Sequence, residues 1–244
     1  MKKFHEIKIR IYRAVDNLTA CERFAKGHSD VLASYGIKKV TSSSKNWFND
    51  PKVYLIMVES LSGDKTFGGA RLHLKNKDFK LPLEEALGHL DSKIFELIAD
   101  NGEYKTGELC GLWNTKLMSG SGLSVILIRS GVAKAGILIA KKLNIKSLYT
   151  LSAPWTIGMV KEIGFTVEYE MGKKGEFEYP NPDLIATVLV LKDIDTLKNA
   201  KSNERDSIIN LRENPIQKKD ETGPKGIIEV EYDLITDENQ INII

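Results

Sequence analysis

The clearest pattern along the chain is a strict alternation of apolar and polar residues in two segments that lie far apart in the sequence. Isoleucine occupies every second position from Ile7 to Ile11, and apolar residues alternate with acidic ones from Ile228 to Leu234. Because the side chains of a strand point alternately to its two sides, each segment predicts a strand with one buried face. The pattern leaves open whether the second strand joins the chain's own sheet or that of a neighbouring subunit in a homodimer.

The residues between these segments alternate between patterns typical of helices and of strands. Apolar residues recur at spacings of three or four in the long run that begins at Leu123, and Asp16 is expected to cap the first helix. Turn residues near Gly63 and Gly172 predict two hairpins. The expected helices span residues 18–35, 83–90, 92–99, 123–143 and 154–163, and the expected strands span residues 7–11, 53–58, 66–74, 108–113, 147–151, 166–170, 185–191 and 228–234. This order predicts an α/β fold, a mixed sheet with helices on both faces.

The segment from about Lys198 onward differs in composition from the rest. It is charged and contains Pro215 and Pro224, neither of which can continue a helix or a ladder. We therefore expect one domain over residues 1–197, followed by a charged C-terminal extension over residues 198–244 with a terminal strand. The stretch from Lys218 to Lys225 is expected to be mobile.

Composition excludes several classes of function. The 244 residues include 35 Lys and Arg against 33 Asp and Glu, a net charge of +2 that gives no reason to expect a nucleic-acid partner. Cys21 and Cys110 are too few for a disulfide framework, so we expect reduced thiols and a cytoplasmic protein. Four histidines show no ligand spacing, and no metal is expected. They are His5, His28, His73 and His89.

Neither a signal peptide nor a membrane span is expected. Charged residues from Glu6 to Arg10 interrupt the apolar run that a signal peptide needs. The most apolar segment, from Leu123 onward, contains Arg129 and Lys134, so it predicts a buried helix.

A glycine-rich turn, Ser119-Gly120-Ser121-Gly122, lies between a predicted strand and the long helix. Glycine lets backbone N–H groups approach an anion, and the helix dipole favours negative charge, so the turn suits a phosphate; a flexible connection is an equally good explanation. The Gly-Lys-Ser/Thr ending of a P-loop is absent. A dinucleotide fold would need a third small residue at Val125 and a carboxylate after the next strand, and both are missing.

The chain resembles the GNAT superfamily of acyl-CoA N-acyltransferases over roughly Glu108 to Phe165. The matching pieces are the strand from Glu108 to Asn114, the glycine-rich turn, the long helix, the strand that follows, and the Gly164-Phe165 pair. The resemblance implies a twisted sheet with a splayed central strand that offers pantetheine its backbone, while the loop holds the pyrophosphate of acetyl-CoA or a longer acyl-CoA. The residues that it implies for coenzyme binding are Leu112, Trp113, Asn114, Lys116, Ser119, Gly120, Ser121, Gly122 and Leu123.

Within the superfamily the chain is more similar to N-acyl amino acid synthases and acyl-homoserine-lactone synthases. Arg71-Leu72, the segment from Leu81 to Glu84, and Glu108 at the start of the central strand match their pattern. The acidic and aromatic N-terminal signature of the lactone synthases is absent, so a lactone product is not expected. The resemblance leaves open whether CoA or an acyl carrier protein is the donor.

Two positions depart from the superfamily's pattern. Leu117 stands where the loop usually has Arg or Gln, although the adjacent Lys116 can offer a phosphate contact. Val160 stands where many members have a tyrosine that protonates the leaving thiolate. Either another group supplies that proton, or the protein binds acyl-CoA without turning it over.

Glu108 is the preferred candidate for the general base, because it begins an apolar strand beside the expected splay. The alternative is a strand-end carboxylate facing solvent. Glu59 is the reserve base. Arg71 is a candidate to hold a carboxylate of the acceptor or a carrier phosphate, with a surface salt bridge as the alternative. Trp155 is a candidate for lining the pocket, with core packing as the alternative. Cys110 has no nearby histidine and is expected in the core.

The resemblance therefore implies an enzyme that moves an acyl group directly from acyl-CoA or an acyl carrier to a primary amine of a small molecule. A non-catalytic acyl-CoA-binding or sensing module of the same fold is the alternative, which Val160 favours and Glu108 disfavours.

Overall fold

The computed structural model describes residues 2–37, 45–99 and 105–236. The predicted loop around residues 38–51 lies partly outside this range. The strands are β1 (Lys3–Arg13), β2 (Val53–Glu59), β3 (Thr66–Leu74), β4 (Lys105–Asn114), β5 (Ile145–Ser152), β6 (Thr166–Val167), β7 (Glu176–Glu178), β8 (Ile185–Leu191), β9 (Ile216–Gly223) and β10 (Gly226–Asp233). The α-helices are α1 (Leu18–Ser34), α2 (Pro82–Leu87), α3 (Lys93–Leu97), α4 (Leu123–Ala140), α5 (Pro154–Glu162) and α6 (Ser202–Glu213), and the short 3₁₀ helices are η1 (Ala14–Asp16) and η3 (Asn46–Asn49).

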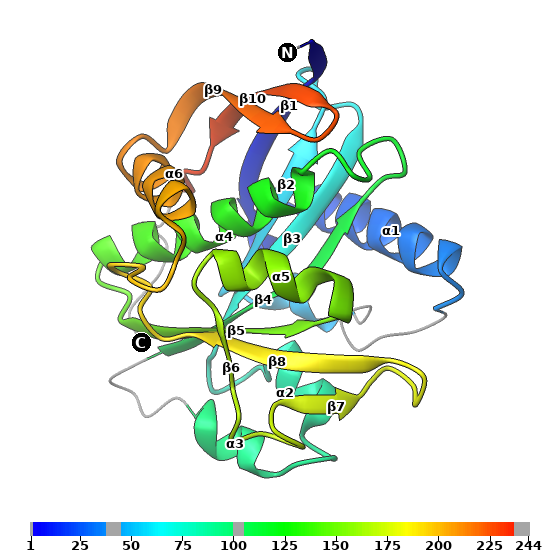
Figure 1. Cartoon of the computed structure of the whole chain (residues 1–244), viewed down its shortest axis with the longest axis vertical. Coiled ribbons are helices and arrows are strands. Elements are labelled where there is room, and N and C mark those ends of the chain that lie inside the picture. Colours follow the sequence, from blue (N-terminus) through cyan, green and yellow to red (C-terminus); the bar gives the residue numbers. More distant parts are fainter. Residues whose placement is uncertain (1, 38–44, 100–104, 237–244) are drawn as a thin grey trace.

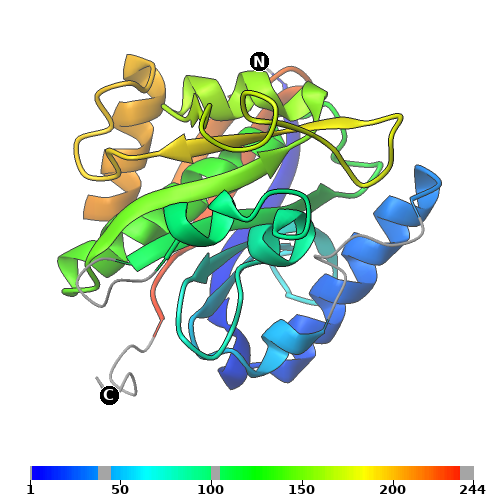
Figure 2. The same ribbon diagram turned by 90° about the horizontal axis from the view of Figure 1, so that it is seen from below.

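The described strands form one mixed sheet in the order β6-β8-β5-β4-β3-β2-β1-β10-β9, with β7 also paired to β8. The β1–β10 and β4–β5 pairs are parallel, and the other pairs are antiparallel. In Figure 1, α4 and α5 cross in front of this sheet, and Figure 2 shows α1 on the opposite side from α5 and α6. The predicted α/β architecture with helices on both faces is therefore confirmed.

Alternate residues of each strand supply two separate cores. On the α4 face, Ile7, Ile56 and Leu72 join the apolar side of α4 in the largest buried cluster. On the α1 face, Leu55 and Met57 pack against α1 in a second cluster that contains several aromatic rings. A third cluster lies under α2 and α3. Strands β2 to β4 are therefore covered on both faces, and polar side chains such as Arg71 are buried among them.

The helix α4 is long and apolar enough, by length and composition alone, to cross a membrane. Its residues Leu123, Leu127 and Leu138 are fully buried against the sheet and α6. The expectation of a buried helix is confirmed.

The strand predicted from Ile228 to Leu234 joins the chain's own sheet as β10, parallel to β1, with Ile7 opposite Val230. The expectation that the stretch from Lys218 to Lys225 is mobile was wrong, because residues 216–223 form β9 and pair with β10 throughout. The hydrophobic pattern missed β9, since it is an edge strand whose side chains are mostly charged and exposed.

Buried ion pairs tie the C-terminal residues to α4. Both guanidinium edges of Arg129 on α4 are used: Nε and Nη2 donate to Glu204 of α6 at 2.5 and 2.8 Å, and Nη1 donates to Glu221 of β9 at 2.7 Å. The Tyr232 hydroxyl of β10 donates to the same Glu221 at 2.9 Å. These contacts fix α6, β9 and β10 to the helix that begins at the glycine-rich turn.

Two local predictions need correction. Asn17, rather than Asp16, caps α1, because its side-chain oxygen accepts the Ala20 N–H at 2.9 Å while Asp16 binds Arg13. The predicted second hairpin is also more complex than expected. Its first strand ends at Val167, and the chain around Gly172 leads into β7, so both β6 and β7 pair with β8.

Candidate functional site

The parallel strands β4 and β5 separate in the middle of the sheet. They pair from Lys105 to Glu108 on β4, whereas β4 continues beside β3 to Asn114 and β5 continues beside β8 to Ser152. Glu108, opposite Tyr149, is the last paired residue. The backbone of β4 beyond Glu108 therefore has an open edge toward β5, which is the splay that the resemblance implies.

A bulge turns β4 immediately after the splay begins. The β3–β4 register shifts between Gly69 and Arg71, and Gly111 on β4 has φ +59°, a left-handed conformation that favours glycine. A methyl group on Gly111 would lie 3.2 Å from Nε of Arg71. The bulge thus brings the backbone of the splayed strand close to the Arg71 guanidinium.

The β4–α4 loop (residues 115–122) lies at the carboxyl end of β4, where the splay opens. Gly120 and Gly122 have φ +68° and +94°, so both need the conformational freedom of glycine. Their N–H groups have no hydrogen-bond partner in the described part of the chain. Unpaired N–H groups at a helix start favour an anion.

The other residues of the predicted coenzyme site divide into three groups. Leu112, Trp113, Ser121 and Leu123 are half-buried or buried. Asn114 donates to the Ser124 hydroxyl at 2.9 Å and ties the strand to the helix. Lys116 and Ser119 are exposed on the loop.

Glu108 is buried beneath α2, on the face of the sheet that carries Arg71. One carboxylate oxygen accepts the Leu83 N–H at 2.7 Å. Burial raises the pKa of Glu108 to about 8, although this hydrogen bond and the charge of Arg71 oppose the rise. A carboxyl whose pKa lies near neutrality can both accept and release a proton.

Arg71 of β3 is fully buried among aromatic rings. Its guanidinium carbon lies 4.4 Å from the ring centre of Trp47 and 5.3 Å from that of Phe24. A weak contact joins Nη2 to the sulfur of Cys110 at 3.9 Å. Burial lowers the pKa of Arg71, and cation–π contacts stabilise its charge.

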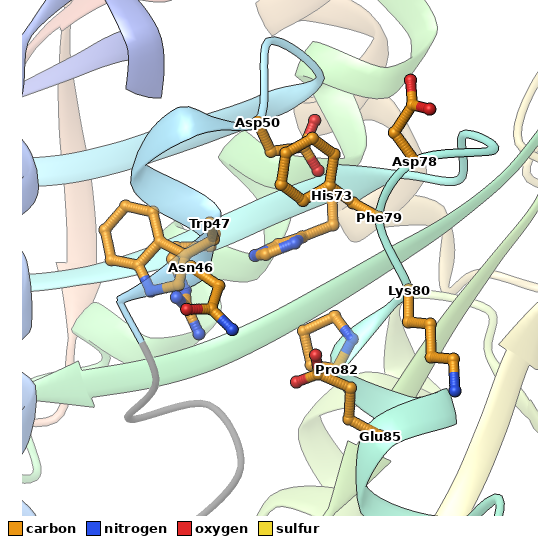
Figure 3. A pocket seen from close by; sticks show the side chains of 10 residues that line it. Asn46, Trp47, Asp50, His73, Asp78, Phe79, Lys80, Pro82 and Glu85 are labelled. Carbon is orange, nitrogen blue, oxygen red and sulfur yellow. The ribbon is translucent and has the colours of Figure 1, made fainter.

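A cavity of about 330 Å³ opens beside Arg71 on the α1 face of the sheet (Figure 3). Figure 3 shows the imidazole of His73 between Trp47 on one side and Pro82 on the other. The buried part of the cavity is formed by Trp47, Asp50, Arg71, His73 and Pro82. Its rim is formed by Asn46, Asp78, Phe79, Lys80 and Glu85.

Sequence reasoning missed His73 and Asp50. His73 lies opposite Glu108 in the β3–β4 register, and its Nε2 is buried with no hydrogen-bond partner among the described residues. Burial and the charge of Arg71 lower its pKa well below the usual 6.5. Asp50 is buried with a pKa raised by burial to about 6. The position of His73 two residues after Arg71, on the same strand face, was the sequence signal for His73.

The remaining candidates lie away from this cavity. Glu59 of β2 accepts hydrogen bonds from Tyr12 at 2.9 Å and Arg23 at 2.6 Å, and β3 separates its strand from β4. Trp155, in the first turn of α5, is 68% exposed. Val160 is buried in the core on the α4 face.

Cys110 is half-buried, and burial raises the pKa of its thiol to about 12, so it remains a thiol rather than a nucleophilic thiolate. Within the described residues, no three His, Cys, Asp or Glu side chains gather as a metal site would require.

No protein-family model and no curated protein sequence matches this chain. The solved structures that share its fold include the following three. A CoA-dependent acyl-homoserine lactone synthase, BjaI, bound to SAM and isopentyl-CoA, is 12% identical with a TM-score of 0.54, covering 93% of this chain and 94% of BjaI. FeeM, an N-acyl amino acid synthase from uncultured soil microbes, is 13% identical with a TM-score of 0.51, over 76% of this chain and 91% of FeeM.

The third is NAA60 of Arabidopsis thaliana in complex with a bisubstrate analogue. It is 15% identical with a TM-score of 0.50, over 75% of this chain and 97% of NAA60. At these identities the likeness concerns the fold. The chain has a GNAT-like acyltransferase fold, as the resemblance in its sequence implied.

Proposed function

We propose that this protein transfers an acyl group from acyl-CoA to the primary amine of a small molecule. The observation that carries this proposal is the position of Glu108, a buried carboxyl at the point where β4 and β5 separate. The splay beyond Glu108 offers pantetheine the backbone edge of β4, and the N–H groups of Gly120 and Gly122 face the pyrophosphate. Glu108 and Arg71 then lie between the donor and the cavity that receives the acceptor.

The acceptor is an amine that also carries a carboxylate, such as an amino acid. Arg71 forms part of the buried wall of the cavity, and its guanidinium matches a carboxylate in charge and shape. Carboxylates of Asp50 and Glu85 line the same cavity and suit an ammonium group. The likeness to an N-acyl amino acid synthase supports this class of acceptor.

The proposed reaction needs no covalent enzyme intermediate. Glu108 takes a proton from the acceptor ammonium, and the free amine attacks the thioester carbonyl carbon. The attacking nitrogen releases its second proton to solvent, the carbon–sulfur bond breaks, and the products are an amide and CoA. The same carboxyl returns its proton to the departing thiolate, because its pKa of about 8 is close to the ~8.5 of a thiol. Glu108 would thus supply the proton that, in many superfamily members, comes from a tyrosine at the position of Val160.

Val160 supports a second candidate, a module that binds acyl-CoA without turning it over. The side chain is packed in the core, so α5 offers no acid at that position. Binding would then use the splay and the β4–α4 loop alone.

Native mass spectrometry of freshly purified protein tests the donor half of the proposal by detecting a co-purified CoA thioester, whose mass also gives the acyl chain length. Release of free thiol from acetyl- and decanoyl-CoA, measured with each proteinogenic amino acid, tests the acceptor half. The matched control for glycine is methylamine, which lacks the carboxylate. CoA binding without thiol release would favour the binding module, and equal rates with glycine and methylamine would remove Arg71 from acceptor recognition.

A further inference from the structure

The turn between β9 and β10 packs directly against the β4–α4 loop. A methyl group on Gly223 would lie only 1.9 Å from the carbonyl oxygen of Ser121, so the two backbones touch. From the other side, a methyl group on Gly122 would lie 3.5 Å from Cδ of Pro224. The C-terminal turn therefore covers one side of the loop on which the proposed coenzyme site depends.

This contact constrains the direction of a functional N–H group. The Ser121 carbonyl and the Gly122 N–H belong to one planar trans peptide, so they point in opposite directions. Gly223 presses on the oxygen side, and Gly122 holds φ +94°. Its N–H, which has no partner in the described residues, is consequently fixed on the side away from the turn.

The turn is itself held in place from a distance. Arg129, which lies on α4 two turns beyond the loop, binds Glu204 and Glu221, and the pairing of β10 with β1 anchors the other strand of the hairpin. Loop, helix and hairpin thus form one closed set of contacts.

We propose that the turn Gly223–Gly226 is a positioning element of the coenzyme site, and that Gly223 is its positioning residue. The C-terminal residues 216–233 then act in coenzyme binding through the Ser121–Gly122 peptide. This inference rests on the proposed function, because it assigns CoA to the β4–α4 loop.

The chain offers a matched pair of variants for the test. In Gly223→Ala the new methyl group meets Ser121 of the loop. In Gly226→Ala it meets the carbonyl oxygen of Lys2 on the opposite side of the hairpin, at 2.5 Å, where φ is also +128°. Both changes disturb the same turn, but only the first acts on the loop.

Calorimetric titration with CoA should show binding roughly tenfold weaker in Gly223→Ala, a loss of about 1.4 kcal/mol, and within about threefold of wild type in Gly226→Ala. Circular dichroism and thermal melting compare the folded state of the two variants. Unchanged affinity in Gly223→Ala would overturn the proposal. An equal loss in Gly226→Ala would also overturn it, because the effect would then follow from damage to the hairpin.

Pro224→Gly decides the question if Gly223→Ala does not fold, since it adds no atoms and only loosens the turn. Its CoA affinity should fall by about threefold or more, and an unchanged affinity would count against the proposal. Wild-type protein is the common reference. Absence of CoA binding in wild type would refute the proposed function itself. If wild type binds CoA and the turn variants bind it equally well, only the role of the turn is refuted.

Discussion

Arg71 is fully buried and Arg129 is largely buried, and the surroundings of these two arginines differ. Arg129 donates to the carboxylates of Glu204 and Glu221, whereas Arg71 stacks against Trp47 and Phe24 beside a cavity. Burial alone would lower both pKa values. The partners of Arg129 reverse the effect and raise its pKa, but the pKa of Arg71 stays lowered.

We interpret this difference as that between a charge that stabilises the fold and a charge proposed to bind the acceptor. A charge enclosed by opposite charges has its strongest interactions in the folded protein itself, so its removal should affect stability. A charge that lies against aromatic rings beside a cavity is placed where the carboxylate of a ligand could approach it, and the proposed function would explain its cost in stability. The region around Glu108 and His73 also carries features that cost stability. Burial raises the pKa of Glu108, and Nε2 of His73 is buried without a hydrogen-bond partner among the described residues.

Glu108→Gln should have the largest effect on activity. The amide keeps the size of the side chain and can still accept the Leu83 N–H, but it cannot take a proton. We expect the rate of acyl transfer to fall by roughly 10²–10⁴ with little change in CoA affinity. Glu59→Gln is the matched control, because Glu59 is bound to Tyr12 and Arg23 away from the cavity. Near-wild-type turnover in Glu108→Gln would end its assignment as the base.

Arg129→Met should have the largest effect on stability. It removes the guanidinium from the buried carboxylates of Glu204 and Glu221, and although Tyr232 still donates to Glu221, the expected cost is about 3–5 kcal/mol of unfolding free energy. Arg71→Met should cost less than about half of that while raising the KM for the acceptor. Urea denaturation and steady-state kinetics measure the two quantities. Equal losses of unfolding free energy in the two variants would show that Arg129 and Arg71 contribute equally to stability, which contradicts this comparison.

The pH dependence of stability sharpens the comparison at Glu108. Its folded pKa of about 8 exceeds the ordinary value of 4.5, so the folded state holds an extra proton between these values. The stability from this group is fully present below about pH 4.5 and is lost as pH rises through about 8. Relative to Glu108→Gln, wild type should lose stability between about pH 5 and 8.5. Urea denaturation measures the free energy of unfolding of both proteins at each pH. The same change with pH in wild type and Glu108→Gln would contradict the raised pKa of Glu108.

Activity should change in the opposite direction over the same range. The base must be ionised to accept a proton, so kcat/KM should rise with pH through about 8. A pH-rate profile of the wild-type enzyme measures this, and a rate that is flat across that range would argue against Glu108.

The smallest expected effect concerns Lys225, in the turn beside the loop. Its Cε lies 3.8 Å from the position of a methyl group on Gly120, and it makes no ion pair in the described part of the chain. Lys225→Met should weaken CoA binding by about two- to fivefold at low salt and less at high salt, the scale of an exposed charge. Lys218→Met is the control, since Lys218 pairs with Glu231 farther along the hairpin.

The parts of the site that the sequence predicted are those encoded locally. Glu108 and the glycine-rich turn lie within one strand–loop–helix unit, whose elements the hydrophobic periodicity predicted and whose role the resemblance to GNAT enzymes implied. The cavity was not predictable in this way, because Trp47, Asp50, His73 and Pro82 come from separate elements that only the packing of the sheet brings together. The edge strand β9 also escaped prediction, since it is set by its pairing with β10 rather than by an apolar face.

The parallel pairing of β1 with β10 has a consequence for how the chain folds. Lys3 of β1 lies opposite Ile227 of β10. The pairing of β1 with β10 therefore forms only after more than two hundred further residues have been synthesised. Contacts of such sequence separation carry a high loop-closure entropy and slow the search for the native topology. Until β10 is made, one edge of β1 offers unpaired backbone groups to other nascent chains. Aggregation during expression should therefore be sensitive to synthesis rate and to chaperones that protect this edge.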